Sequence, residues 1–274
     1  MNKFLKIIVF FFIVFILFYT LNFQLFLESI KKLNLNYLIC TLIFSCLYIF
    51  TEAILFKNII LNDKVDLSIN KSFSLTCNTY LFNMILPLSG MAWRAYYLDK
   101  NYDFKYKKYI KFLIQFLILE VSFSFFLLLL FIQIHIFKNI NFYFVVGNLT
   151  FFLIMIYLLN IIYVKFFKTK NFITLTFITF FLILTYFFVV QSIFLSLGKN
   201  LLFDSIFLSL TLGISNYITI TPGTYGILEG TAVLSTLFID ILKEEGLLIA
   251  LLIRLSLIFV VLINYIFNLK KSNL

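Results

Sequence analysis

Charged side chains are scarce in this chain. Only 12% of its 274 residues are Asp, Glu, Lys or Arg, whereas 63% are hydrophobic and the mean hydropathy is +1.07. A soluble globular domain carries about 25% charged residues, so the composition excludes that class. Apolar runs of about 20 residues cross a bilayer as helices. The composition therefore predicts an integral membrane protein with an all-α fold.

Residues that bind metals or cross-link chains are almost as scarce. The chain has one histidine, His135, and its three cysteines, Cys40, Cys46 and Cys77, lie in apolar segments without CxxC spacing. These residues predict neither a disulfide framework nor a metal site. The sequence also has no HExxH motif, no Asp and His grouping and no serine elbow. We therefore expect no cofactor and no enzyme active site.

Six apolar runs are long enough to cross the membrane, and two further apolar segments contain the chain's two prolines, Pro87 and Pro222. The first run follows Lys3 and Lys6, but it is too long for a signal peptide and has no small-residue cleavage site behind it. We interpret it as a retained first helix. The six predicted spans are 7–27, 37–56, 112–132, 142–162, 172–191 and 247–267.

The net charge of +10 reflects lysines that lie in the loops between the spans. In a membrane protein such lysines set the orientation, so we expect no nucleic-acid partner. If the segments 68–98 and 203–239 each enter and return on one side, the cytoplasmic loops hold fifteen lysines and the outer side holds five. Treating 68–98 as a full span places the basic run KNYDFKYKKYIK outside and removes this bias. The charges predict two re-entrant hairpins and cytoplasmic termini. We expect the protein in a bacterial inner (plasma) membrane.

The two halves of the chain match after a shift of 135 residues. The shift places the predicted spans 7–27, 37–56 and 112–132 on 142–162, 172–191 and 247–267, and it places one proline on the other. Each half then has three spans, and an odd number requires opposite insertion, as in many secondary transporters. This predicts one membrane domain with inverted repeats over 1–135 and 136–274. The alternative is chance similarity between two apolar halves.

Four charged residues obey the same shift. Arg94 and Glu229 each lie seven residues after a proline, and Glu120 and Arg254 lie 33 and 32 residues after one. All but two of the 22 basic residues are lysine, and both arginines belong to this set. A charge at the centre of a membrane helix costs about 2.5–3.5 kcal/mol, so such residues face a partner or a wet cavity. We predict that the four lie together, whereas Glu52, near the end of its run, is expected to be interfacial.

Two alternatives accompany this prediction. Arg94 in the first segment would instead lie at the cytoplasmic interface with its side chain extended toward water. Glu229 and Arg254 would instead form a purely structural pair that fixes a hairpin to a helix.

The turns of the two hairpins are expected to be binding elements. Irregular backbone at membrane depth is tolerated only where it is buried in protein or lines water. Glycines permit the turns: Gly90 in NMILPLSGMAWRAYYL, and Gly223 and Gly226 in TPGTYGILEG. The helix that restarts after each turn presents free N–H groups, which suit an anion. Asn83 and Asn216 supply further hydrogen bonds at the hairpin necks.

The stretches LPLSGMAWRAYYL and TPGTYGILEG, followed by an arginine in ALLIRLSL, resemble the membrane region of lysylphosphatidylglycerol synthase, the flippase-like domain family. Members typically show an LP…G…R element, a PGGLGxxE element and an arginine in the last helix. The resemblance covers essentially the whole chain. This sequence departs from the pattern at Thr224 and Tyr225, where the family has glycine and leucine, and at Met91, where many members have an acid.

The resemblance implies movement of a lipid with a polar, often phosphate-bearing head group between leaflets. Arg94 and Arg254 would then bind the phosphate, and Glu229 and Glu120 would be their partners or sites of protonation. The chain ends seven residues past the last span, so we expect no aminoacyl-transfer domain. The alternatives are a non-catalytic scaffold for a partner glycosyltransferase or synthase and, more weakly supported, a membrane-embedded lipid transferase.

Overall fold

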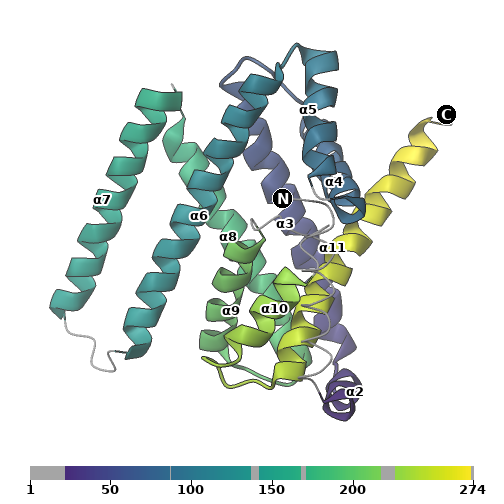
Figure 1. Cartoon of the computed structure of the whole chain (residues 1–274), viewed down its shortest axis with the longest axis vertical. Helices are drawn as coiled ribbons and strands as arrows, with labels where there is room; N and C mark the ends of the chain where they lie inside the picture. Colours follow the sequence, from purple (N-terminus) through teal and green to yellow (C-terminus); the bar gives the residue numbers. More distant parts are fainter. Residues whose placement is uncertain (1–21, 87, 137–141, 168–170, 217–225, 273–274) are drawn as a thin grey trace, which may run out of the picture.

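The computed structural model describes residues 22–86, 88–136, 142–167, 171–216 and 226–272. Over these ranges the chain is helical, with short turns between the helices (Figure 1). The helices are α2 (Phe23–Lys31), α3 (Leu35–Leu61), α4 (Ile69–Ile85), α5 (Ser89–Tyr102), α6 (Tyr106–Ile136), α7 (Phe142–Phe167), α8 (Phe172–Ser196), α9 (Leu202–Ser215), α10 (Ile227–Ser235) and α11 (Lys243–Ser272).

Four of these helices are long and apolar enough to cross a membrane. They are α3, α6, α8 and α11, and they contain the predicted spans 37–56, 112–132, 172–191 and 247–267. The predicted span 142–162 falls within α7, which has 26 residues and packs at the edge of the bundle against α6 and α8. The expectation of an all-helical membrane protein is therefore confirmed.

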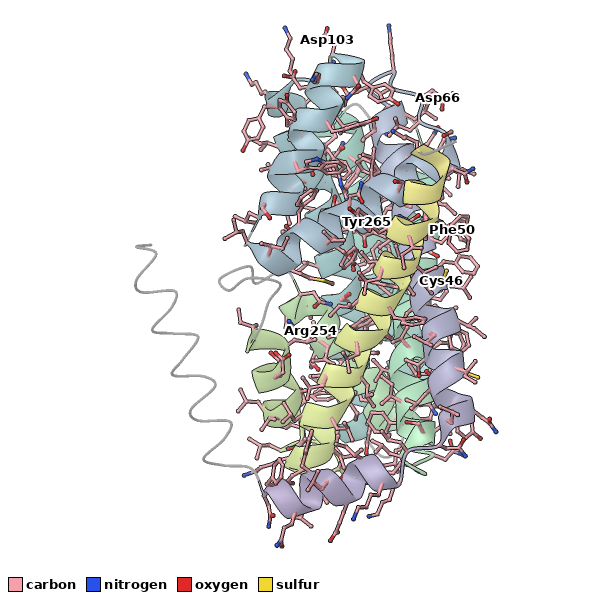
Figure 2. The ribbon with its side chains drawn as sticks, turned by 90° about the vertical axis from the view of Figure 1, so that its right-hand side faces the viewer. Cys46, Phe50, Asp66, Asp103, Arg254 and Tyr265 are labelled. Carbon is pink, nitrogen blue, oxygen red and sulfur yellow. The ribbon has the colours of Figure 1, made fainter. Side chains whose placement is uncertain are left out.

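The predicted first span, 7–27, needs a correction at its end. Residues 1–21 lie outside the described part of the chain, but Asn22 is extended and its side chain accepts hydrogen bonds from the N–H groups of Gln24 and Leu25. Asn22 thus caps α2, so residues 23–27 begin a new helix. The Asn22 N–H also donates to Glu244 Oε1 at 2.8 Å, in the first turn of α11. Helix α2 thus lies across the N-terminal end of α11 (Figure 2).

Two pairs of shorter helices lie toward opposite ends of the molecule. The α4–α5 pair lies in the upper half of Figure 1 and the α9–α10 pair in the lower half. Asp66 before α4 and Asp103 after α5 both lie at the same end, so this pair turns back on itself (Figure 2). The turn includes Leu88 in the left-handed region with φ 66°. Pro87, Pro222 and Gly223, predicted to form the bends, lie outside the described residues.

The core is formed where α3 crosses α8. Ile49, Leu55, Phe56, Val189 and Ile193 are completely buried there. Small hydroxyl side chains join α3 to two neighbouring helices. The hydroxyls of Thr41 on α3 and Ser192 on α8 lie 2.8 Å apart, and those of Ser45 on α3 and Ser256 on α11 lie 2.7 Å apart. Small polar residues of this kind let membrane helices approach closely and hydrogen-bond to one another.

Helices α4 and α5 meet at Gly90. A Cβ atom added to Gly90 would lie 2.0 Å from the carbonyl oxygen of Thr79, which is part of the α4 backbone. Backbone cannot move aside as a flexible side chain would, so the contact requires glycine. The sequence predicts that Gly90 permits the turn of the first hairpin. In the structure Gly90 lets α4 and α5 approach each other closely.

Replacing Gly90 by alanine is expected to lower the free energy of unfolding by about 3 kcal/mol, because overpacking forces α4 and α5 apart. The matched control is Gly213→Ala in α9, where nothing lies within 4 Å of the added Cβ. That change is expected to raise stability by about 0.5–1 kcal/mol, since alanine favours a helix interior. Unfolding in detergent micelles measures both, and equal stability of the two variants would contradict the close contact.

Candidate functional site

A cavity of about 350 Å³ lies among α3, α4, α5, α6, α9, α10 and α11. Most of its wall is apolar. Both arginines of the chain line it, and Arg254 lies about midway along α11 (Figure 2). The polar lining residues are Tyr48, Glu52, Thr79, Tyr80, Asn83, Arg94, Tyr109, Asn216 and Arg254.

Arg254 forms a buried ion pair with Glu229. The Nη2 atom lies 3.0 Å from Oε1 and donates to Oε2 at 3.2 Å, and the two side chains are 10% and 7% exposed. Glu229 also accepts a hydrogen bond from the backbone N–H of Gly226 at 2.8 Å, just before α10 begins. One carboxylate therefore satisfies the start of α10 and holds it to α11. Of the predicted hairpin residues, Gly226 has a positive φ of 82°, which suits glycine.

Arg94 is held differently. Its Nε donates to Thr79 Oγ1 at 2.6 Å, and its guanidinium lies 4.4 Å from the centroid of the Phe56 ring, in a cation–π contact. Within the described ranges no carboxylate lies within 4.0 Å of Arg94. The residue is 4% exposed, so the alternative position at an exposed interface is wrong. Arg94 also lines the cavity.

The predicted partnership of Glu120 with an arginine is not formed. Glu120 on α6 is 5% exposed, and its Oε2 has no hydrogen-bond partner among the residues that the structure describes. The charged group that acts on Glu120 is Glu52. The shift of 135 residues relates positions along two helices but does not fix which way each side chain points, so it could not establish the pairing.

Glu52 is the main residue that sequence reasoning placed wrongly. It lines the cavity, accepts a hydrogen bond from Tyr80 at 2.7 Å, and interacts electrostatically with Arg94. The apolar run ends soon after Glu52, but α3 continues to Leu61, and Glu52 is half-buried in the wall of the cavity. The available signal was the spacing of four from Tyr48, which places both residues on one helix face.

Three further polar residues complete the cavity. Asn83 Oδ1 accepts the Gly90 N–H at 2.9 Å and so supports the turn between α4 and α5. Asn216 Nδ2 lies 3.4 Å from the hydroxyl of Tyr186. Tyr109, which the sequence did not single out, has a buried hydroxyl without a hydrogen-bond partner within the described ranges. Asn83 and Asn216 thus both line the cavity, and Tyr109 adds a donor without a partner among the described residues.

The chain matches the family model of the lysylphosphatidylglycerol synthase TM region over residues 3–263. No curated protein and no solved structure matches it. The match agrees with the resemblance carried by the two glycine-containing motifs and the arginine of α11. The chain therefore belongs to the family of the lysylphosphatidylglycerol synthase transmembrane region.

Proposed function

We propose that this chain is a transporter, and not an enzyme, that moves a lipid with an anionic, phosphate-bearing head group between leaflets. The observation that carries the proposal is the cavity of about 350 Å³ with two arginines in a largely apolar wall. A guanidinium offers planar pairs of N–H donors that match phosphate. Apolar walls suit the parts of a lipid next to its head group, while the acyl chains remain in the bilayer.

The charges of the cavity favour Arg94 as the primary phosphate contact. Arg254 is already neutralised by Glu229 at 3.0 Å, whereas no described carboxylate pairs directly with Arg94. Tyr109 lines the same cavity, and its buried hydroxyl has no hydrogen-bond partner among the described residues. A bound phosphate would therefore satisfy two sets of buried donors without first breaking an ion pair.

The transport proposal includes an architecture of two inverted repeats with re-entrant hairpins α4–α5 and α9–α10. Adding 135 to the residue numbers of α3 gives 170–196, which nearly matches α8 (Phe172–Ser196). The same shift turns the range of α6 into 241–271, which nearly matches α11 (Lys243–Ser272). The two short-helix pairs lie toward opposite ends of the molecule (Figure 1). Inverted repeats of this kind bring broken elements together around a central site.

Orientation follows from the lysines. Those near the ends of α3 and α5 and the starts of α4 and α6 gather at the end of the molecule where α11 also finishes (Figure 1). The opposite end combines lysines with Asp240, Glu244 and Glu245. By the positive-inside rule we assign the lysine-rich end to the cytoplasm, in the inner (plasma) membrane of a bacterium, with both termini on that side.

Translocation of fluorescent phosphatidylglycerol in proteoliposomes tests the function. Wild-type protein is expected to move the labelled lipid to the opposite leaflet, where a membrane-impermeant quencher detects it. The Tyr109→Phe variant is expected to be about tenfold slower, because removing one hydrogen bond to a charged group costs about 1.5 kcal/mol. Tyr106→Phe is the matched control, since Tyr106 is 63% exposed and should keep the wild-type rate.

Other outcomes would overturn the transport proposal. Chemical alteration of the lipid in the vesicles would indicate a membrane-embedded transferase. A wild-type protein that moves no lipid, but copurifies with a glycosyltransferase or synthase, would indicate a scaffold. An equal loss of rate in the Tyr106 and Tyr109 variants would mean that the cavity does not determine transport.

A further inference from the structure

Two acidic residues, one in the cavity wall and one on α6, differ in their hydrogen bonding: among the described residues only the first has a donor. Glu52 lines the cavity and accepts a hydrogen bond from Tyr80 at 2.7 Å. Glu120 is 5% exposed, and its Oε2 has no hydrogen-bond partner in the described part of the chain. The two carboxyl groups lie close enough to interact electrostatically.

The surroundings of Glu120 supply little positive charge. The charged group that acts directly on it is Glu52, whereas Arg94 acts on Glu52 and Arg254 acts on Tyr186. Helix α9 contributes Asp204 in its first turn, where that carboxylate binds the backbone of Asp240. The other titratable groups that act on the pair are tyrosines and one cysteine: Tyr48 on α3, Cys77 and Tyr80 on α4, Tyr109 on α6 and Tyr186 on α8.

These contacts decide which carboxyl group is ionised. An isolated carboxylate removed from water is strongly destabilised and takes up a proton instead. Two neighbouring carboxylates also oppose each other's ionisation. Glu52 has a hydroxyl donor and the charge of Arg94 to stabilise its ionised form, whereas Glu120 has neither. The proton therefore belongs on Glu120.

We propose that Glu52 and Glu120 form a proton-binding pair: Glu120 holds a proton in this conformation, and Glu52 takes up a second proton when an anionic head group occupies Arg94. The second proton comes from water and adds to a carboxylate oxygen of Glu52. It is needed because a phosphate on Arg94 takes over the charge that stabilised ionised Glu52. One anion and one proton then enter together without changing the net charge of the cavity.

The two parts of the inference are separable. The proton on Glu120 follows from burial and contacts alone. The coupled uptake by Glu52 rests on the proposed function, since it requires an anionic head group at Arg94. Two measurements on the full-length protein in detergent distinguish failure of one part from failure of the other.

Infrared spectroscopy tests the first part. At neutral pH the wild type is expected to show the C=O stretching band of a protonated carboxylic acid. The Glu120→Gln variant should lose it, whereas Glu52→Gln should keep it at a shifted frequency because its neighbour has changed. The exposed Glu28→Gln should leave it unchanged. A wild type without the band, or a band that survives in Glu120→Gln, would overturn the assignment. Loss of the band on adding sodium ions would indicate a metal cation site instead.

Proton uptake on binding short-chain phosphatidylglycerol tests the second part. A phosphodiester does not titrate near neutral pH, so any protons taken from a weakly buffered solution bind to the protein. We expect about one proton per bound lipid in the wild type and none in Glu52→Gln. Lipid binding without proton uptake would overturn the coupling while leaving the transport proposal intact. No lipid binding despite an intact infrared band would overturn the transport proposal and leave the proton on Glu120.

Discussion

Replacing Arg94 by glutamine is expected to weaken binding of short-chain phosphatidylglycerol by about ten- to a hundredfold and to stop its translocation. A hydrogen bond to a charged group contributes about 1.5–3 kcal/mol, and each 1.4 kcal/mol changes the affinity tenfold. Arg94 is 4% exposed, lines the cavity, and has no described carboxylate within 4.0 Å. Its loss therefore removes the positive charge that is most available to a phosphate.

The chain contains its own probe for this binding. Trp93 is the single tryptophan, and it lies next to Arg94 between Phe82 and Tyr97, with ring centroids 5.2 Å and 5.6 Å away. Tryptophan fluorescence during a lipid titration should therefore report the occupation of the cavity. A saturable change is expected in the wild type, with its midpoint displaced to higher lipid concentration in Arg94→Gln.

The Arg94→Lys variant separates charge from geometry. Lysine keeps the positive charge but loses the planar pair of donors, so an intermediate affinity is expected. A wild-type affinity in Arg94→Gln would show that the phosphate binds elsewhere. Because Arg94 also interacts with Glu52, the double variant Arg94→Gln with Glu52→Gln serves as a stability control. It removes both charges, so it should remain folded and still bind lipid weakly.

The sequence was most informative where charge conflicts with hydrocarbon. Arg94 and Arg254 are isolated bases in apolar segments, and the cost of exposing them to lipid predicts a shared cavity, which both residues line. Placing a polar amide in hydrocarbon is also costly, so Asn83 and Asn216 were expected in the same site, and both line the cavity. The existence of the long helices was also predictable. An apolar run of about 20 residues, such as 172–191, is expected to cross the membrane as a helix, and α8 covers this run.

Boundaries and side-chain directions were less predictable. Asn22 caps α2 inside an apolar run, and hydropathy does not detect a cap. Glu52 was assigned to the interface because the apolar run stops near Lys57, although the helix continues to Leu61. Tyr109 is one of 16 tyrosines, so composition alone gave no reason to select it for the cavity.

Breaking the buried ion pair is expected to have a large effect on stability. Arg254→Met and Glu229→Gln should each lower the free energy of unfolding by about 3 kcal/mol, because each leaves a buried charge without its partner. The double variant should lose about 2 kcal/mol less than the sum of the two, since neither charge then remains. Chemical unfolding in detergent gives these values. An additive double variant would contradict direct pairing.

A second glutamate supplies a matched comparison. Glu245 accepts the N–H of Leu242 at 2.8 Å at the start of α11 and pairs with Lys199 at 2.6 Å, much as Glu229 binds Gly226 and Arg254. The basic partners differ in exposure, because the side chain of Lys199 is 27% exposed and that of Arg254 is 10% exposed.

Lys199→Met is therefore expected to cost at most about 1 kcal/mol, since water already screens that pair. The difference between the Lys199 and Arg254 variants measures what burial adds to an otherwise similar arrangement. A purely structural Arg254 predicts that the double variant with Glu229 loses less stability than the sum of the two single variants and still translocates lipid. A head-group ligand at Arg254 predicts the same smaller loss of stability without translocation. Equal costs for Lys199→Met and Arg254→Met would mean that the ion pair does not hold α10 to α11.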